Sequence, residues 1–135
     1  MPRNTKVAPK CTPYTQPLDR FFFRQYKAFV RRIEDFVILD NIDLNLNDRN
    51  DIIKRQSLTH NQFSAEMFLD YRRFSWHKCG YTDTCIPFTN SVKYCFDVNI
   101  SAELCSKCEN TAFLKCAHCQ ALLCFYHFYY EYHYH

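Results

Sequence analysis

The clearest periodic pattern of apolar and polar positions lies between residues 19 and 39. Charged side chains fill the gaps between the apolar ones, as in an amphipathic helix that buries one face. The pattern therefore predicts a helix over residues 19–39, with Asp19 as its N-terminal cap. Four of the five prolines precede this segment, so residues 1–18 are predicted to form an extended arm. The apolar stripe consists of Phe22, Tyr26, Phe29, Val30, Ile33, Phe36 and Val37.

A second helix is predicted over residues 59–78. Thr59 and Gln62 have the spacing of a capping box at its start. Gly80, the only glycine of the chain, stands where a left-handed residue commonly ends a helix. Residues 40–50 are rich in Asn and Asp, which favour turns, and are predicted to form a loop between the helices. The expected apolar face consists of Phe63, Met67, Tyr71 and Phe74.

A third pattern covers residues 91–100, where polar and apolar side chains alternate from Ser91 and Val92 to Asn99 and Ile100. A period of two is typical of a strand with one buried face. We therefore expect a half-buried strand in this segment.

Composition excludes several classes of function. One glycine in 135 residues leaves no glycine-rich phosphate loop, dinucleotide-binding fingerprint or G-x-S-x-G nucleophile elbow. The metalloprotease pattern H-E-x-x-H and the deaminase pattern H-x-E are also missing from the sequence. The protein is therefore predicted not to be an enzyme, and no catalytic residue is assigned. Aromatic residues make up 18% of the chain, and such residues are enriched where proteins contact one another.

Cysteine and histidine form a regular series near the C-terminus. Each of the first three pairs leaves a gap of two residues, which lets both side chains face one metal ion. The N-terminus lacks the apolar core of a signal peptide, so an intracellular, reducing compartment is expected, where clustered cysteines more often bind metal than form disulfides. The series predicts Zn²⁺, with one ion expected and a second possible. The pairs are Cys105 and Cys108, Cys116 and Cys119, Cys124 and His127, and His133 and His135.

Four ligands are needed for each structural zinc ion. The first and third pairs are predicted to share one ion, and the second pair is predicted to bind another with His133 and His135. On a helix those two histidines would point about 200° apart, so the second site requires a non-helical tail. His118 or an upstream cysteine is an alternative ligand. A looser group of His77, Cys79, Cys85 and Cys95 is interpreted more simply as ordinary side chains.

The order of the ligand pairs resembles the cross-brace zinc modules, and its spacing is nearest to that of B-box fingers. It departs from the RING pattern in its central ligands, Cys116 and Cys119, with His118 directly before Cys119. The resemblance implies a small α+β fold, in which an extended arm and helices precede a C-terminal cross-brace (B-box/RING-like) zinc module. The expected parts are a basic arm (1–18), a helical region (19–80), a loop and strand connector (81–104) and the zinc module (105–135).

The whole chain resembles a family of small baculovirus proteins that carry a U-box/RING-like domain and are needed for nucleocapsid assembly. The features that carry the resemblance are the length, the basic proline-spaced start, the Phe-Phe-Phe segment and the zinc pairs. It implies a structural zinc-binding protein that docks other viral capsid proteins, located in the virion and the host cell nucleus. An alternative is a RING/U-box-like ubiquitin ligase, because such domains recruit ubiquitin-conjugating enzymes, whereas B-boxes mostly mediate assembly.

Charge adds a second alternative. Residues 1–32 contain eight Lys and Arg against one acidic residue, which favours contact with DNA or another polyanion. A nucleic-acid-binding accessory factor is therefore also possible. No membrane contact is expected, because the longest apolar stretch, residues 121–130, is about half the length of a membrane span and is interrupted by His127.

Overall fold

The computed structural model describes residues 21–135, so the predicted arm (1–18) and the Asp19 cap lie outside the described residues. The fold is small and rich in helices, with one short antiparallel sheet of two strands. The elements are α2 (Phe23–Leu39), α3 (Arg49–Phe63), the 3-10 turn η2 (Glu66–Phe68), α4 (Leu69–Lys78), α5 (Ser91–Cys95), the 3-10 turn η3 (Ile100–Ala102), β1 (Leu114–Lys115), β2 (Leu122–Leu123) and the π-helical turn η4 (Tyr126–Tyr130).

The first predicted helix is confirmed as α2 over the described residues. Four positions of its apolar stripe are buried: Phe29, Val30, Ile33 and Val37. The helix ends on Asn41, whose φ of 50° lies in the left-handed region. The N–H groups of Asn41 and Ile42 then donate to the carbonyls of Ile38 and Val37 at 3.3 and 3.0 Å, which satisfies the last turn.

The boundaries of the second predicted helix and of the loop before it are wrong. Helix α3 begins at Arg49, inside the predicted loop, because the Asp48 side chain caps it by accepting from the N–H of Asn50 at 3.0 Å. Thr59 does not start a helix. It is buried inside α3, and its hydroxyl donates to the carbonyl of Arg55 at 2.8 Å.

The predicted continuous helix is also interrupted after Phe63, and α4 begins only at Leu69. At the end of α3, the last carbonyl groups accept hydrogen bonds from side chains, and no further helical turn follows. The Arg72 guanidinium donates to the carbonyl of Phe63 at 2.6 Å, and the Ser64 hydroxyl donates to that of Asn61 at 2.7 Å. At the far end of α4, Gly80 has the expected left-handed backbone with a φ of 80°.

The predicted strand over residues 91–100 is wrong. Ser91–Cys95 form α5, which is capped by the Asn90 side chain through the N–H of Lys93 at 3.0 Å. The Asp97 carboxylate then accepts from the N–H of Asn99 at 2.9 Å and closes a turn. Val98, an inward position of the predicted strand, is 86% exposed. Two local side-chain caps therefore outweigh the alternating pattern.

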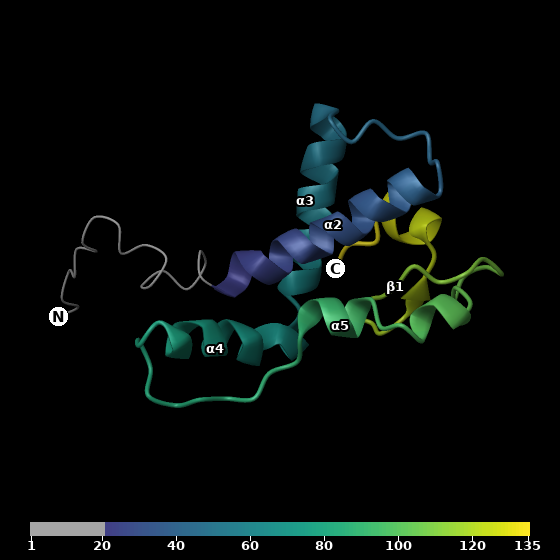
Figure 1. The fold of residues 1–135 in the computed structure, drawn as a ribbon. Coiled ribbons are helices and arrows are strands. Elements are labelled where there is room, and N and C mark those ends of the chain that lie inside the picture. Colours follow the sequence, from purple (N-terminus) through teal and green to yellow (C-terminus); the bar gives the residue numbers. More distant parts are fainter. Residues whose placement is uncertain (1–20) are drawn as a thin grey trace.

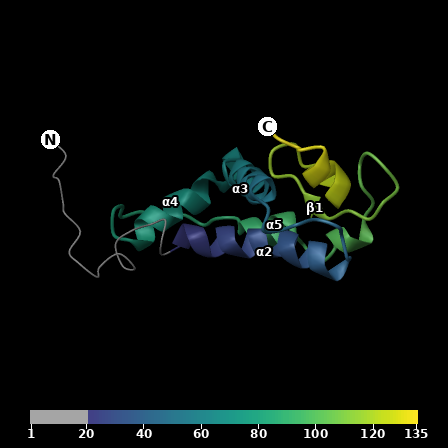
Figure 2. The same cartoon turned by 90° about the horizontal axis from the view of Figure 1, so that it is seen from above.

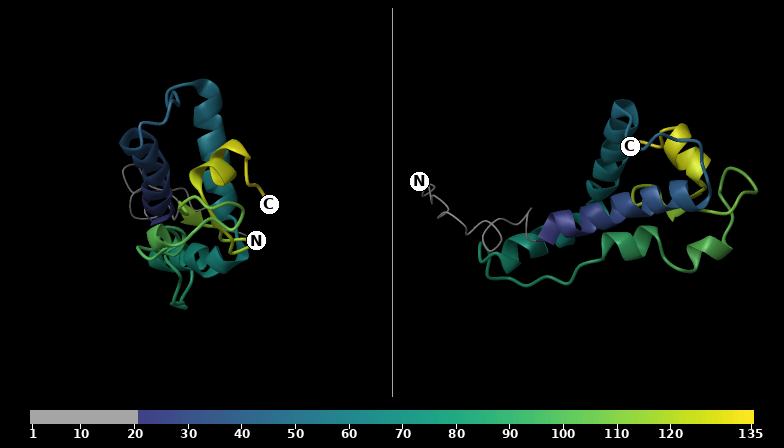
Figure 3. Two further views of the ribbon diagram at one scale, coloured as in Figure 1. Left: turned by 90° about the vertical axis from the view of Figure 1, so that its right-hand side faces the viewer. Right: turned by 45° about the horizontal axis from the view of Figure 1, so that its top comes forward.

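The core forms where α2 packs against α3 on one side and α5 on the other (Figures 1 and 3). Phe29 of α2 lies at the centre, with its ring centroid 5.7 Å from that of Phe63 and 4.8 Å from that of Phe96. Further along α2, Phe36 stacks on Phe125 at 5.0 Å, which attaches the C-terminal segment to the helices. That segment and α4 lie at opposite ends of the molecule (Figure 2). Among the described residues, no helix combines the length and apolar character that a membrane span requires.

Candidate metal centres

The first cluster consists of Cys105, Cys108, Cys124 and His127. Nδ1 of His127 lies 3.4, 3.5 and 3.1 Å from the sulfurs of Cys105, Cys108 and Cys124, and the sulfurs of Cys108 and Cys124 are 3.7 Å apart. A zinc tetrahedron with usual bond lengths has edges of about 3.8 Å between sulfurs and about 3.6 Å between sulfur and nitrogen. The four donor atoms therefore fit one Zn²⁺ ion.

The short sheet brings these residues together. Leu114 and Lys115 of β1 pair with Leu123 and Leu122 of β2, so the turn before β1 and the chain after β2 meet at one end. The turn is closed by a hydrogen bond from the N–H of Cys105 to the carbonyl of Asn110 at 2.8 Å. The third pair follows directly, with Cys124 after β2 and His127 within η4.

Two thiols of this cluster are shifted in opposite directions: burial raises the pKa of Cys124, whereas the pKa of Cys105 is lowered. Burial acts to raise the pKa of the Cys105 thiol, but hydrogen bonds, chiefly from the backbone N–H groups of Lys107, Cys124 and Cys108, outweigh burial and lower it to about 6. A thiolate, the form that binds metal, is thus favoured at neutral pH. The carboxylate of Glu131 lies 3.8 Å from Nε2, the ring nitrogen of His127 that faces away from the three sulfurs.

The second cluster consists of Cys116, Cys119, His133 and His135, whose donor atoms all lie within 4.8 Å of one another. Nε2 of His133 is 3.4 Å from the sulfur of Cys119 and 3.0 Å from Nε2 of His135. These values are close to the tetrahedral edges of about 3.6 and 3.3 Å expected around zinc. Burial, followed by the nearby His135, lowers the pKa of His133, which favours the neutral ring that a metal requires.

A backbone turn lets His133 and His135 lie close to one metal site, although on a helix they would point about 200° apart. Tyr132 has a φ of 50°, and the N–H of His133 donates to the carbonyl of Phe128 at 3.1 Å, so the helical turn η4 ends before His133. The residues after Tyr132 are not helical, and both imidazoles lie in one group with Cys116 and Cys119. The first pair of this cluster is formed by a similar turn, in which Gln120 has a φ of 62°.

The structure therefore brings the eight predicted ligands into two groups of four, in which the first and third pairs alternate with the second and fourth. The alternative ligand His118 belongs to neither group, since its Nε2 lies 2.6 Å from the carbonyl oxygen of Asn61. Among residues 21–135, no third group with metal-binding geometry includes the looser set His77, Cys79, Cys85 and Cys95.

The part of α3 that contacts the second cluster was not predicted from the sequence. Asn61 and Gln62 are 2% and 0% exposed, and their amide groups are hydrogen-bonded to residues of the second cluster and its backbone. Two adjacent amide residues on a polar helix produce no periodic signal. Only their burial reveals them.

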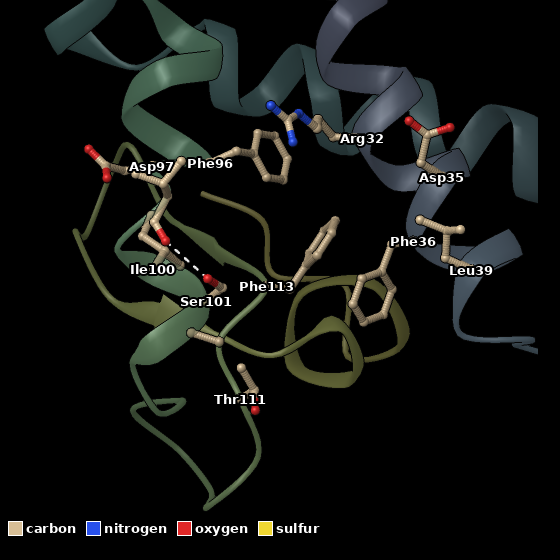
Figure 4. A pocket seen from close by; sticks show the side chains of 12 residues that line it. Arg32, Asp35, Phe36, Leu39, Phe96, Asp97, Ile100, Ser101, Thr111 and Phe113 are labelled. Atoms are coloured by element: carbon tan, nitrogen blue, oxygen red, sulfur yellow. Dashed lines mark hydrogen bonds between the residues drawn. The ribbon is translucent and has the colours of Figure 1, made fainter.

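A separate groove of about 500 Å³ lies between α2 and residues 96–113 (Figure 4). Three aromatic rings form its floor: that of Phe113 lies 4.7 Å from Phe36 and 5.3 Å from Phe96. Leu39 and Val98 at its edge are 78% and 86% exposed. This is an apolar surface that is open to a partner.

The profile of the Tc5 transposase C-terminal domain family matches residues 76–135. The matched segment contains all eight residues of the two clusters, whereas α2 and α3 lie outside it. No curated protein and no solved structure matches the chain significantly.

Proposed function

We propose that the protein is a structural zinc-binding protein, in which two Zn²⁺ ions stabilise a C-terminal cross-brace module that docks other proteins in an assembly. The observation that carries the proposal is the pair of Cys and His clusters, each with four donor atoms that all lie within 4.8 Å of one another. Four protein ligands complete the coordination of each ion and leave no open position for a substrate, which is typical of structural sites.

The groove in Figure 4 supports docking and indicates what docks. Its floor is aromatic, and its rim includes the exposed carboxylates of Asp35 and Asp97, neither of which has an ion pair among the described residues. The only cation of the lining, Arg32, lies over the ring of Phe96 at 5.9 Å. The groove therefore suits a partner segment with an apolar anchor next to Lys or Arg.

Selection of a random peptide library on the zinc-loaded protein tests this docking surface. We expect the enriched peptides to contain a Leu or aromatic residue beside a basic one. The substitution Val98→Lys should weaken their binding at least tenfold, because it removes an apolar contact and places a cation beside the basic residue of the peptide. Loss of an anchor contact costs about 2 kcal/mol or more.

Ile53→Lys is the matched control, because Ile53 is 55% exposed on α3, outside the groove. It should bind the peptides like the unchanged protein. Enrichment of acidic peptides, or equal binding by both variants, would contradict the proposed surface.

The assembly that we propose is a viral nucleocapsid, with other capsid proteins as partners and the virion and host cell nucleus as locations. This part of the proposal rests on the resemblance to baculovirus nucleocapsid-assembly proteins. It would be abandoned if the protein were missing from purified nucleocapsids.

Contact with nucleic acid is a second candidate function. Arg24, Lys27 and Arg31 are exposed on α2 at spacings of three and four residues, so they lie along one side of the helix. Within the described residues none of them has an ion pair. A transposase acts on DNA, so the similarity of residues 76–135 to a transposase domain also favours this function.

Replacing these three residues of α2 by Ala should weaken binding to duplex DNA of any sequence. The slope of log affinity against log salt should fall by about 2 to 3, since each lost phosphate contact removes about 0.9. Filter binding at several salt concentrations measures both effects. The control removes three exposed cations from other positions: Arg49, Lys78 and Lys93. An equal loss in both variants would show that only net charge matters and would reject the α2 surface.

A further inference from the structure

The second cluster is attached to α3 by two buried amide side chains. Both ends of the Gln62 amide are used: Oε1 accepts from the N–H of Ala117 at 2.8 Å, and Nε2 donates to the sulfur of Cys116 at 3.3 Å. Gln62 is fully buried, so water does not compete for these bonds. The side chain therefore holds the turn that carries the first two ligands.

Asn61 holds the other pair of ligands. Its Nδ2 donates to the carbonyl of His135 at 2.7 Å, and its Oδ1 accepts from the N–H of His135 at 3.2 Å. The carbonyl of Asn61 also lies 2.6 Å from Nε2 of His118, whose ring stacks on that of His135 with centroids 4.9 Å apart. Two hydrogen bonds with Asn61 and the stacked ring of His118 thus hold His135 in place.

The two ligand pairs of this cluster come from chain segments that only tertiary structure brings together. Cys116 and Cys119 follow β1, whereas His133 and His135 follow η4. Neighbouring residues of one helix bind one segment each, so the end of α3 sets the distance between them. Among the described residues, no hydrogen bond joins α3 to a ligand of the first cluster.

We propose that Asn61 and Gln62 are positioning residues for the metal ion of the second cluster, and that this ion is bound tightly only while α3 is packed against it. The inference rests on the proposed zinc binding. The transposase-like segment, residues 76–135, contains the ligands of this site but not the two residues that position them.

Titration of the full-length protein with Co²⁺ tests the proposal, because charge-transfer and ligand-field bands report thiolate ligation and tetrahedral geometry. Three thiolates in the first cluster and two in the second give the two sites different spectra. We expect Gln62→Met to weaken Co²⁺ binding at the second site at least tenfold and to change its thiolate band. The first site should keep its affinity and its spectrum.

Two further variants keep the test decisive. Gln62→Glu retains the acceptor for Ala117 and replaces the amide that donates to the sulfur, so it should bind Co²⁺ more weakly at the second site. Gln56→Met is the matched control, because Gln56 lies on α3 and is bonded to Tyr26 instead of the cluster. It should behave like the unchanged protein at both sites.

The possible failures are distinguishable. If the unchanged protein binds no metal, the proposed zinc function fails, and this inference fails with it. If the unchanged protein binds two ions and both Gln62 variants bind them equally well, the positioning role alone is rejected. Simultaneous loss of both sites in the Gln62 variants would also reject it, since it would indicate general unfolding.

Discussion

Removal of metal by a chelator should unfold residues 105–135 and leave much of α2 and α4 helical. Structural zinc contributes roughly 10–16 kcal/mol of apparent binding free energy, which exceeds or equals the roughly 5–15 kcal/mol that holds a whole domain together. The two strands have only two residues each, so backbone pairing alone does not hold this segment together without its ligands. Far-UV circular dichroism and limited proteolysis, before and after zinc is added back, measure the change.

Cys108→Ala removes one of the four ligands of the first cluster and should therefore release its ion without a chelator. Cys85→Ala is its control, because Cys85 is an exposed free cysteine outside both clusters. Elemental analysis should find two zinc ions per chain in the control and fewer in Cys108→Ala. A C-terminal segment that resists protease equally well without metal would refute the structural role of the ions.

Phe29→Ala should lower the free energy of unfolding by about 3–5 kcal/mol, a large share of the stability of a domain of this size. The ring is 0% exposed and contacts Phe63 of α3 and Phe96 after α5, so its loss leaves a cavity where three helices meet. Urea denaturation of the zinc-loaded protein, followed by fluorescence and circular dichroism, provides the measurement.

Phe23→Ala on the same helix is the matched control. Its ring is 37% exposed, and its aromatic neighbours, Phe22 and Tyr26, are next to it on the same stretch of chain. We expect a loss below about 1 kcal/mol, as is usual for partly exposed positions. Losses of similar size at Phe23 and Phe29 would mean that the core is not centred where the structure places it.

Helix α3 shows why part of the fold escaped prediction. Its buried face includes Arg55, Thr59, Asn61 and Gln62, so the apolar period that identified α2 is missing. These polar side chains are buried because partners distant in sequence satisfy many of their polar groups, as when Arg55 forms an ion pair with Glu34 at 3.3 Å. Such partners are known only once the chain has folded.

The strand predicted over residues 91–100 was wrong for a different reason. Its alternating pattern suits a strand, but a strand also needs a neighbour with which to pair. The caps by Asn90 and Asp97 are local and form without one. Tyr94 and Phe96 still pack against the core, so the apolar character of these positions was informative although the element was wrong.

The sequence by itself determined α2, the end of α4 at Gly80 and the three Cys and His pairs between residues 105 and 127, because apolar periodicity, a left-handed glycine and two-residue chelate gaps are properties of short segments. Only the tertiary structure decided how the second cluster closes. The turn at Tyr132 releases His133 and His135 from the helical turn, and Asn61 and Gln62 of α3 hold the two ligand pairs at one place. Those contacts join residues more than fifty positions apart, and no local pattern encodes a distance that depends on how helices pack.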